Sequence, residues 1–276
     1  MSKEVCRLCP HHCTLDENEV GFCRARSNKG GNITAINYGL ITSIALDPIE
    51  KKPLYRFFPG SHILSVGSFG CNLRCPFCQN YEISMVGIEQ AQTRTISPDE
   101  LVSTALSLSP RGNIGIAYTY NEPLVGYEYV RDCAVAARQK GLKNVLVTNG
   151  CFCEEPLKEL LPQIDALNID LKAFTEKFYR KISGDLETVK RAIKLAAGYS
   201  HVEVTTLIIP GENDSEDEVR SLSQWLGSVR CDIPLHLTRF FPRFQMDDQN
   251  PTEVARVYAL AEIARESLQF VYVGNC

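Results

Sequence analysis

Six short apolar runs, separated by stretches with helical periodicity, constrain the fold of this chain more than any other feature of its sequence. The runs occupy residues 62–69, 114–119, 144–149, 166–172, 202–209 and 234–241. The helix-like stretches cover residues 97–109, 123–139, 185–199, 215–229 and 251–268. Apolar runs of this length are typical of strands buried on both faces, and their alternation with helices predicts parallel β/α units.

Polar side chains follow the apolar runs, where each predicted strand ends. They are Cys71, residues 121–123, residues 149–150, Asp170 and Lys172, residues 210–214, and Arg239. A parallel sheet covered by helices closes as a doubly wound sheet or as a full or partial barrel, and both bind ligands at the carboxyl ends of the strands. We therefore expect a catalytic mouth at this edge of an α/β fold.

The length of 276 residues suits one large core plus a small appendage. Residues 1–60 are predicted to form an N-terminal cysteine-rich lobe and adapter strands, because cysteines cluster before a turn at residues 28–32 and short β-favouring runs follow it. Residues 61–276 then hold the regular β/α pattern. No internal repeat interrupts it.

Composition limits the partners and the cellular compartment that we expect for the protein. The net charge of −4 gives no basic field for nucleic acid or anionic lipid. No apolar run reaches the roughly 18 to 20 residues that span a bilayer, and the start MSKEVC lacks the apolar region of a signal peptide, so we expect a cytoplasmic protein. In a reducing compartment, clustered members of the twelve cysteines indicate metal ligands rather than disulfides.

The segment GCNLRCPFCQN at residues 70–80 contains the first of these clusters. Cys71, Cys75 and Cys78 have the spacing C-x3-C-x2-C directly after the first predicted strand. A structural zinc site takes four closed ligands, whereas three thiolates around a 4Fe-4S cluster leave one iron free to bind a small molecule. The missing fourth cysteine therefore favours a cluster with an open iron.

This motif resembles the one that defines the radical S-adenosylmethionine (radical SAM) superfamily. The resemblance implies a partial (β/α)6 barrel in which Cys71, Cys75 and Cys78 hold a catalytic 4Fe-4S cluster. It also implies that the open iron binds SAM, and that reductive cleavage of SAM gives a 5'-deoxyadenosyl radical that abstracts hydrogen from a substrate. Phe77 matches an aromatic residue that lies near the adenine. The protein would then be a metal-binding oxidoreductase.

Residues at three other predicted strands also resemble this family. Asn121 and Glu122 lie where it has a GGEP-like motif that meets the SAM amino group, although Tyr-Asn replaces the glycine pair; Asn-Glu-Pro is also a good helix start. Asp170 and Lys172 resemble a DLK motif that contacts SAM or substrate, and the alternative for them is an ordinary salt bridge. His236 resembles a rim histidine, but a lone histidine on a strand is more often structural.

Residues 47–55, 59–61, 175–184 and 236–241 together look like the AmmeMemoRadiSam-system radical SAM proteins, which are similar to pyruvate formate-lyase activating enzyme. By this analogy the substrate is a glycine of a glycyl radical protein, and a low-potential donor such as flavodoxin or ferredoxin supplies the electron. The alternatives are radical modification of a small molecule, peptide or nucleic acid, and a non-catalytic iron-sulfur or zinc scaffold.

The N-terminal cysteines form a second cluster, with Cys6, Cys9, Cys13 and Cys23 at the spacing C-x2-C-x3-C-x9-C. Four thiolates can close a zinc site or hold a second 4Fe-4S cluster, and both interpretations stay open. His11 and His12 could substitute as ligands. Cys151 and Cys153 follow the third predicted strand, where they are either small buried side chains or thiols near the reaction.

Overall fold

The computed structural model describes residues 3–276, and its centre is an eight-stranded sheet in the order β14-β13-β12-β11-β10-β9-β7-β6. The strands are β6 Ser43–Pro48, β7 His62–Gly67, β9 Asn113–Tyr118, β10 Lys143–Thr148, β11 Ala166–Asp170, β12 His201–Ile208, β13 Leu235–Arg239 and β14 Val271–Gly274. All neighbours pair in parallel except β6, which is antiparallel to β7. The predicted partial barrel is confirmed; β6, from the region of the predicted adapter strands, forms one edge, and β14, which was not predicted, forms the other.

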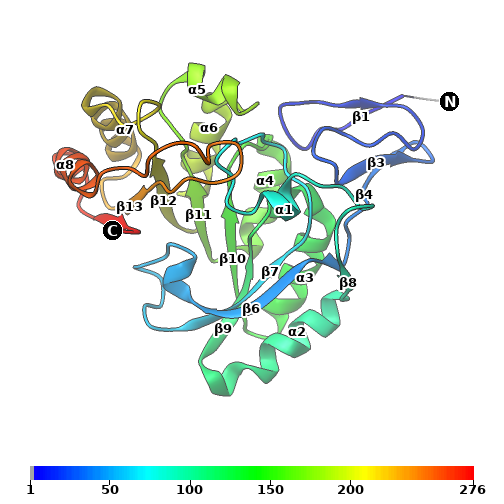
Figure 1. Ribbon diagram of the computed structural model, residues 1–276. Coiled ribbons are helices and arrows are strands. Elements are labelled where there is room, and N and C mark those ends of the chain that lie inside the picture. The colour runs from blue at the N-terminus through cyan, green and yellow to red at the C-terminus, as the bar shows by residue number, and fades with distance from the viewer. Residues whose placement is uncertain (1–2) are drawn as a thin grey trace.

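Helices connect consecutive parallel strands and lie along the outside of the curved sheet (Figure 1). They are α2 Pro98–Ser107, α3 Tyr127–Gln139, α4 Glu154–Leu160, α5 Glu176–Lys181, α6 Leu186–Ala196, α7 Glu216–Val229 and α8 Val254–Arg265. A one-turn helix, α1 Tyr81–Ser84, lies in the loop after β7. No helix among residues 3–276 is long and apolar enough to cross a membrane.

Burial of both faces explains why the sequence shows continuous apolar runs. Val145 and Leu146 are neighbours on β10 and point to opposite faces of the sheet, yet neither is exposed to solvent. Polar residues close the helices at their starts: Ser97 and Glu100 form a reciprocal capping box at the start of α2. At the carboxyl ends of the strands, these buried apolar residues are followed by the polar residues of the mouth.

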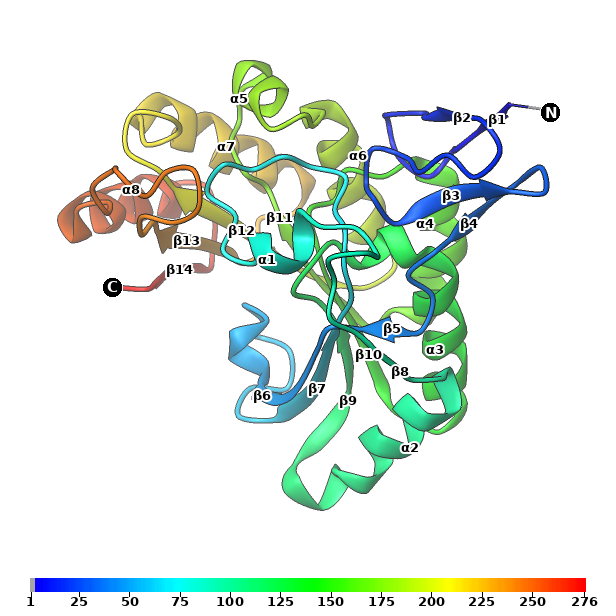
Figure 2. The same cartoon turned by 45° about the vertical axis from the view of Figure 1, so that its right-hand side comes forward.

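The N-terminal lobe consists of two small hairpins beside α4 (Figure 2). They are β1 Glu4–Val5 with β2 Thr14–Leu15, and β3 Arg26–Lys29 with β4 Asn32–Ala35. A further short pair, β5 Leu40–Ile41 with β8 Arg94–Thr95, follows. Arg26 ties the lobe to α3 through a bidentate pair with Glu128, at 2.8 and 2.7 Å. The lobe is thus fixed to the barrel by a charge-assisted contact.

A segment at residues 49–60, which we call the arm, links β6 to β7 and is held by Glu203 of β12. The buried Glu203 carboxylate accepts hydrogen bonds from the backbone N–H groups of Tyr55 (3.0 Å) and Arg56 (2.8 Å). The Nε2 atoms of His201 and His236 lie 2.9 and 2.6 Å from its two oxygens. Burial raises the pKa of Glu203, but these contacts outweigh it and lower the pKa to about 2.

We predict that Glu203 makes stability depend on pH. Its folded pKa of about 2 lies below the ordinary value of 4.5, so its contribution is complete above about pH 5 and is lost as the pH falls towards 2. Between pH 7 and pH 3, Glu203→Gln should remove about 2 kcal/mol of this dependence. Urea unfolding of metal-free protein between pH 7 and 3 measures it, with the exposed Glu176→Gln as control. Parallel stability curves for wild type and Glu203→Gln would contradict the assignment.

Candidate functional site

A cleft of about 860 Å³ opens at the carboxyl ends of the strands. The predicted cluster ligands and the residues predicted to contact SAM or substrate line it: Cys71, Cys75, Phe77, Cys78, Asn121, Glu122, Asp170, Lys172 and His236. The predicted rim positions after β12 and β13 do not. Arg239 turns away to donate to the carbonyl of Thr252 at 2.7 Å, and Asn213 donates to the carbonyl of Lys172 at 2.7 Å. These two residues lie outside the cleft and stabilise the segments around it through hydrogen bonds to backbone carbonyls.

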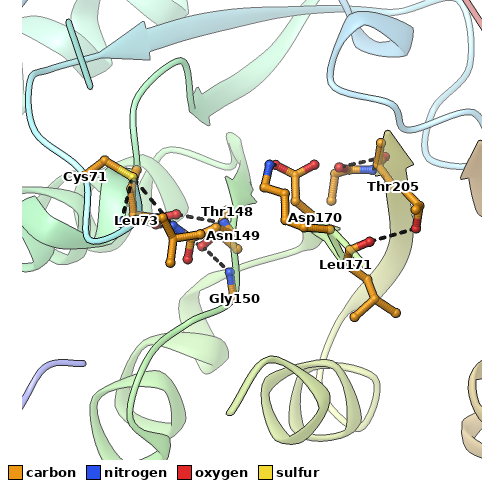
Figure 3. Close-up of polar contacts among 12 residues, drawn as sticks. Cys71, Leu73, Thr148, Asn149, Gly150, Asp170, Leu171 and Thr205 are labelled. Carbon is orange, nitrogen blue, oxygen red and sulfur yellow. Dashed lines mark hydrogen bonds and ion pairs between the residues drawn. The ribbon is translucent and has the colours of Figure 1, made fainter. Parts of the chain in front are cut away.

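The three-cysteine loop is held in the cleft by two asparagines. Asn149, the residue after β10, donates to the Asn72 side chain at 2.8 Å. Its Nδ2 also lies 3.7 Å from the Cys71 sulfur (Figure 3). Asn72 in turn donates to the carbonyl of Cys151 at 2.7 Å. The loop therefore takes its position from the strand two places along the sheet from its own.

The thiols fit a cluster chemically. Cys75 is buried, and burial raises its pKa to about 12 although the Lys172 ammonium opposes that rise. Cys71 and Cys78 are partly buried and line the same cleft. Soft thiolate ligands suit iron-sulfur clusters, and three of them leave one iron position for another ligand. Loading with iron would replace the protons of these thiols.

Glu122 joins the ends of two strands under the cleft. Its Oε1 accepts from the backbone N–H of Leu124 (3.1 Å) and the hydroxyl of Thr148 (2.9 Å), and its Oε2 accepts from the backbone N–H of Asn149 (2.8 Å). Burial raises the pKa of this carboxyl to about 7 against these hydrogen bonds. Glu122, rather than Asn121, caps the short helix that Pro123 begins.

Asn121 instead holds the start of the cysteine loop through hydrogen bonds of its side chain to the backbone. Its Oδ1 accepts from the backbone N–H of Ser68 (3.0 Å), and its Nδ2 donates to the carbonyl of Gly70 (3.0 Å). The preceding residue, Tyr120, has a φ of +71°, the left-handed conformation that favours glycine. The position where the family has glycine therefore keeps a glycine-like backbone although its side chain is large.

Asp170 and Lys172, at the end of β11, form an ion pair of 2.7 Å within the cleft. Figure 3 shows Asp170 beside Thr205 of the next strand. Burial lowers the pKa of the Lys172 ammonium, but Asp170 and Cys75 outweigh it, so the pKa is raised. The predicted salt bridge exists, and the same two charges face the cavity.

His236 lines the cleft with only 3% of its surface exposed. Its ring packs edge-on against Tyr55 at 4.8 Å between centroids and stacks on Tyr272 at 5.3 Å. With its Nε2 against Glu203, this histidine holds the arm as well as bordering the cavity. Its predicted contact with SAM or substrate stays a prediction.

One buried group of the cleft was not predicted from the sequence. Lys52 on the arm pairs with Asp47 of β6 at 2.9 Å, and the Tyr120 hydroxyl donates to the same carboxylate at 2.7 Å. The Lys52 ammonium also lies 4.6 Å from the centroid of the Tyr120 ring. Asp47 and Lys52 stand close in the sequence, but nothing there indicates that Tyr120, distant along the chain, completes the group.

The N-terminal cysteines come together in a separate pocket of the lobe, lined by Cys6, Cys9, Cys13 and Cys23 with His11 among their neighbours. His12 is exposed and lies outside it. Within residues 3–276, no group of three or more His, Cys, Asp or Glu side chains is arranged to hold a single metal ion. Cys151 is buried and Cys153 is partly exposed.

The fold and site define an α/β partial barrel with a three-thiol loop at its mouth, and comparison with known proteins gives its family. The radical SAM superfamily model matches residues 65–222. An uncharacterized protein of Methanocaldococcus jannaschii is 40% identical over 278 residues, which cover 99% of this chain and 82% of that protein. The chain belongs to the radical SAM superfamily. It is a radical SAM enzyme, and the family implies a 4Fe-4S cluster and SAM.

More distant relatives match smaller parts of this chain. Pyruvate formate-lyase 1-activating enzyme of Escherichia coli is 25% identical over 160 residues, or 56% of this chain and 65% of that enzyme. Streptococcus suis SuiB bound to S-adenosylmethionine superposes with a TM-score of 0.60 at 12% identity, covering 78% of this chain and 52% of that one. The latter likeness concerns the fold alone.

We predict that Gly70 fixes the cysteine loop against the lobe. Its φ is +87°, and an added Cβ would lie 2.5 Å from the carbonyl oxygen of Cys23. Gly70→Ala should therefore lower iron content severalfold after anaerobic reconstitution and destabilise the protein. Gly141→Ala is the matched control, because its φ is +75° with no atom within 4 Å of the added Cβ; it should cost only the strain of about 1 kcal/mol. Equal effects of the two variants would refute the prediction.

Proposed function

We propose that the enzyme removes a hydrogen atom from a protein substrate, as a glycyl-radical-activating enzyme of the AmmeMemoRadiSam type. The observation that carries the proposal is the convergence of Cys71, Cys75 and Cys78 with Glu122 and Lys172 on one cleft. The partial match to pyruvate formate-lyase 1-activating enzyme supports the protein substrate. When bound, the 4Fe-4S cluster and SAM supply the one-electron cleavage that creates the hydrogen-abstracting radical.

The chain's own charges suit the zwitterionic end of SAM. Glu122 uses one lone pair of Oε2 for Asn149, which leaves a second for an ammonium group. Lys172 gives one of its three donors to Asp170 and keeps two for a carboxylate. Phe77, packed 6.0 Å from Phe178 between ring centroids, offers a fixed apolar surface for a base. These residues would bind and orient SAM and exclude water around it.

The opposite end of the sheet suits the substrate. The cysteine loop follows β7, whereas His236 and Thr238 lie on β13, near the other edge in strand order. A volume of about 860 Å³ is near the upper end for small-molecule pockets, so the cleft has room for SAM and a further group. A low-potential one-electron donor such as flavodoxin or ferredoxin would act as partner.

A nucleotide is the second candidate substrate. GTP 3',8-cyclase of Arabidopsis thaliana is 30% identical over 202 residues, which cover 70% of this chain and 48% of that enzyme. Deuterium transfer separates the two: candidate proteins labelled at glycine, or labelled nucleotides, are incubated with the reduced enzyme and SAM. The source that delivers deuterium into 5'-deoxyadenosine identifies the substrate class. Transfer from nucleotides alone would overturn the protein-substrate proposal.

We predict that Cys75→Ala abolishes SAM cleavage, because the loop then offers only two thiolates. Anaerobically reconstituted protein is reduced with dithionite, and 5'-deoxyadenosine is measured by chromatography. Product should fall to the level without protein, while the exposed Cys231→Ser retains wild-type yield. Continued cleavage by Cys75→Ala would show that the triad is not the cluster site.

We further predict that Lys172→Met weakens SAM binding at least tenfold, about 1.4 kcal/mol, because a charge-assisted contact is lost and Asp170 is left unpaired. Anaerobic titration calorimetry of the reconstituted protein measures this. Lys181→Met is the matched control: it breaks the exposed pair with Glu212, outside the cleft. Equal affinities in the two variants would exclude Lys172 from the SAM site.

A further inference from the structure

Four thiols line one pocket inside the N-terminal lobe. They belong to Cys6, Cys9, Cys13 and Cys23, and we call them the quartet. Three of them are buried, and Cys13 is partly exposed. The rest of the lining includes Leu8, Leu15, Phe22 and Phe152. An enclosed, mostly apolar pocket that collects four thiols is suited to a buried thiolate-bound metal centre.

The spacing of the quartet favours an iron-sulfur cluster over zinc. Cys6-x2-Cys9-x3-Cys13 places three thiols within eight residues, the same span as the catalytic triad, with the two intervals in reverse order. Short runs of three cysteines with a more distant fourth are typical of cluster loops, whereas structural zinc sites usually combine two separate ligand pairs. Cys23 is the distant fourth.

A positively charged donor also borders the pocket. Arg26 lines it, is 6% exposed, and pairs through its terminal nitrogens with Glu128. Its Nε is buried and has no hydrogen-bond partner among residues 3–276. A buried N–H without a partner is costly, and an anionic four-thiolate cluster would accept from it.

The quartet is joined directly to the catalytic loop. The backbone N–H of Cys71 donates to the carbonyl of Cys23 at 3.1 Å, so a single hydrogen bond links one ligand residue of each set. His11 of the lobe places its Nε2 2.7 Å from the carbonyl of Asn72.

Arg74 makes the third link between the lobe and the catalytic loop. It stacks on Phe22 at 3.7 Å and donates to the carbonyls of Phe22 and of Cys71, the latter at 3.0 Å. Two metal centres held on these segments would be close enough to exchange electrons.

We propose that the quartet ligates a second 4Fe-4S cluster, which relays single electrons to the cluster at Cys71, Cys75 and Cys78. A low-potential donor protein of the flavodoxin class loses one electron to the N-terminal cluster. That cluster returns to its oxidised state when it reduces the catalytic cluster by one electron, and no proton or group moves. Zinc has no accessible redox change and could not perform this step.

Metal analysis tests the site. Anaerobically prepared wild-type protein should contain about eight irons and eight sulfides. The triple variant Cys71→Ala/Cys75→Ala/Cys78→Ala should keep about four, with no bound zinc, and Cys9→Ser/Cys23→Ser should also fall to about four. One zinc at the quartet, or an iron-free triple variant, would overturn the proposal. If Cys9→Ser/Cys23→Ser does not fold, the triple variant and the electron paramagnetic resonance of reduced wild type, which should show two interacting spins, decide it.

Reduction kinetics test the relay. The catalytic cluster is reduced anaerobically with a reduced flavodoxin or with dithionite, and its absorbance is followed by stopped flow. Cys9→Ser/Cys23→Ser should slow reduction by flavodoxin at least tenfold relative to reduction by dithionite, whereas Cys231→Ser should leave that ratio unchanged. Equal ratios in both variants would refute the relay. A zinc-bound quartet with intact SAM cleavage defeats this inference alone, whereas absent SAM cleavage with eight irons defeats the proposed function.

Discussion

The mouth of the barrel depends on one buried carboxylate. Glu122 accepts a backbone N–H from each of the segments after β9 and β10, and so fixes the ends of two neighbouring strands together. Asn149, positioned by that contact, orients Asn72 in the cysteine loop. A buried carboxylate without hydrogen-bond partners is energetically costly. The hydrogen bonds that Glu122 accepts therefore have to be retained in the folded protein. Glu122 therefore both joins the two strand ends and lines the cleft.

The left-handed Tyr120 shows how the chain tolerates a departure from the glycine pattern of its family. A non-glycine residue at a φ of +71° costs roughly 1 to 2 kcal/mol. The Tyr120 hydroxyl bond to Asp47 and the contact of its ring with Lys52 offset this cost. In return the tyrosine anchors the arm and β6 at the cleft, a connection that glycine could not make.

Periodicity and the position of polar residues at strand ends were sufficient to predict the six central strands and to bring Cys71, Glu122 and Asp170 to one edge. Other features were beyond such reasoning. Helices α4 and α5 are too short for a clear period, and β6 joins the sheet only through its antiparallel pairing with β7. The double role of His236, at the cleft and against Glu203, comes from contacts between distant segments, which no local pattern records.

The N-terminal lobe has little hydrophobic core with which to stabilise itself. Its strands β1 and β2 have two residues each, and little apolar surface beyond Leu8 and Leu15 is available for a core. The metal centre proposed at the quartet would supply stability that so small a core lacks, because metal binding would then be coupled to folding of the lobe. Its contacts through Cys23 and Arg74 end on the catalytic loop. If the quartet holds the proposed cluster, its loss would loosen the support of the catalytic triad as well as remove the proposed electron path, so iron content and reduction rate require separate measurements.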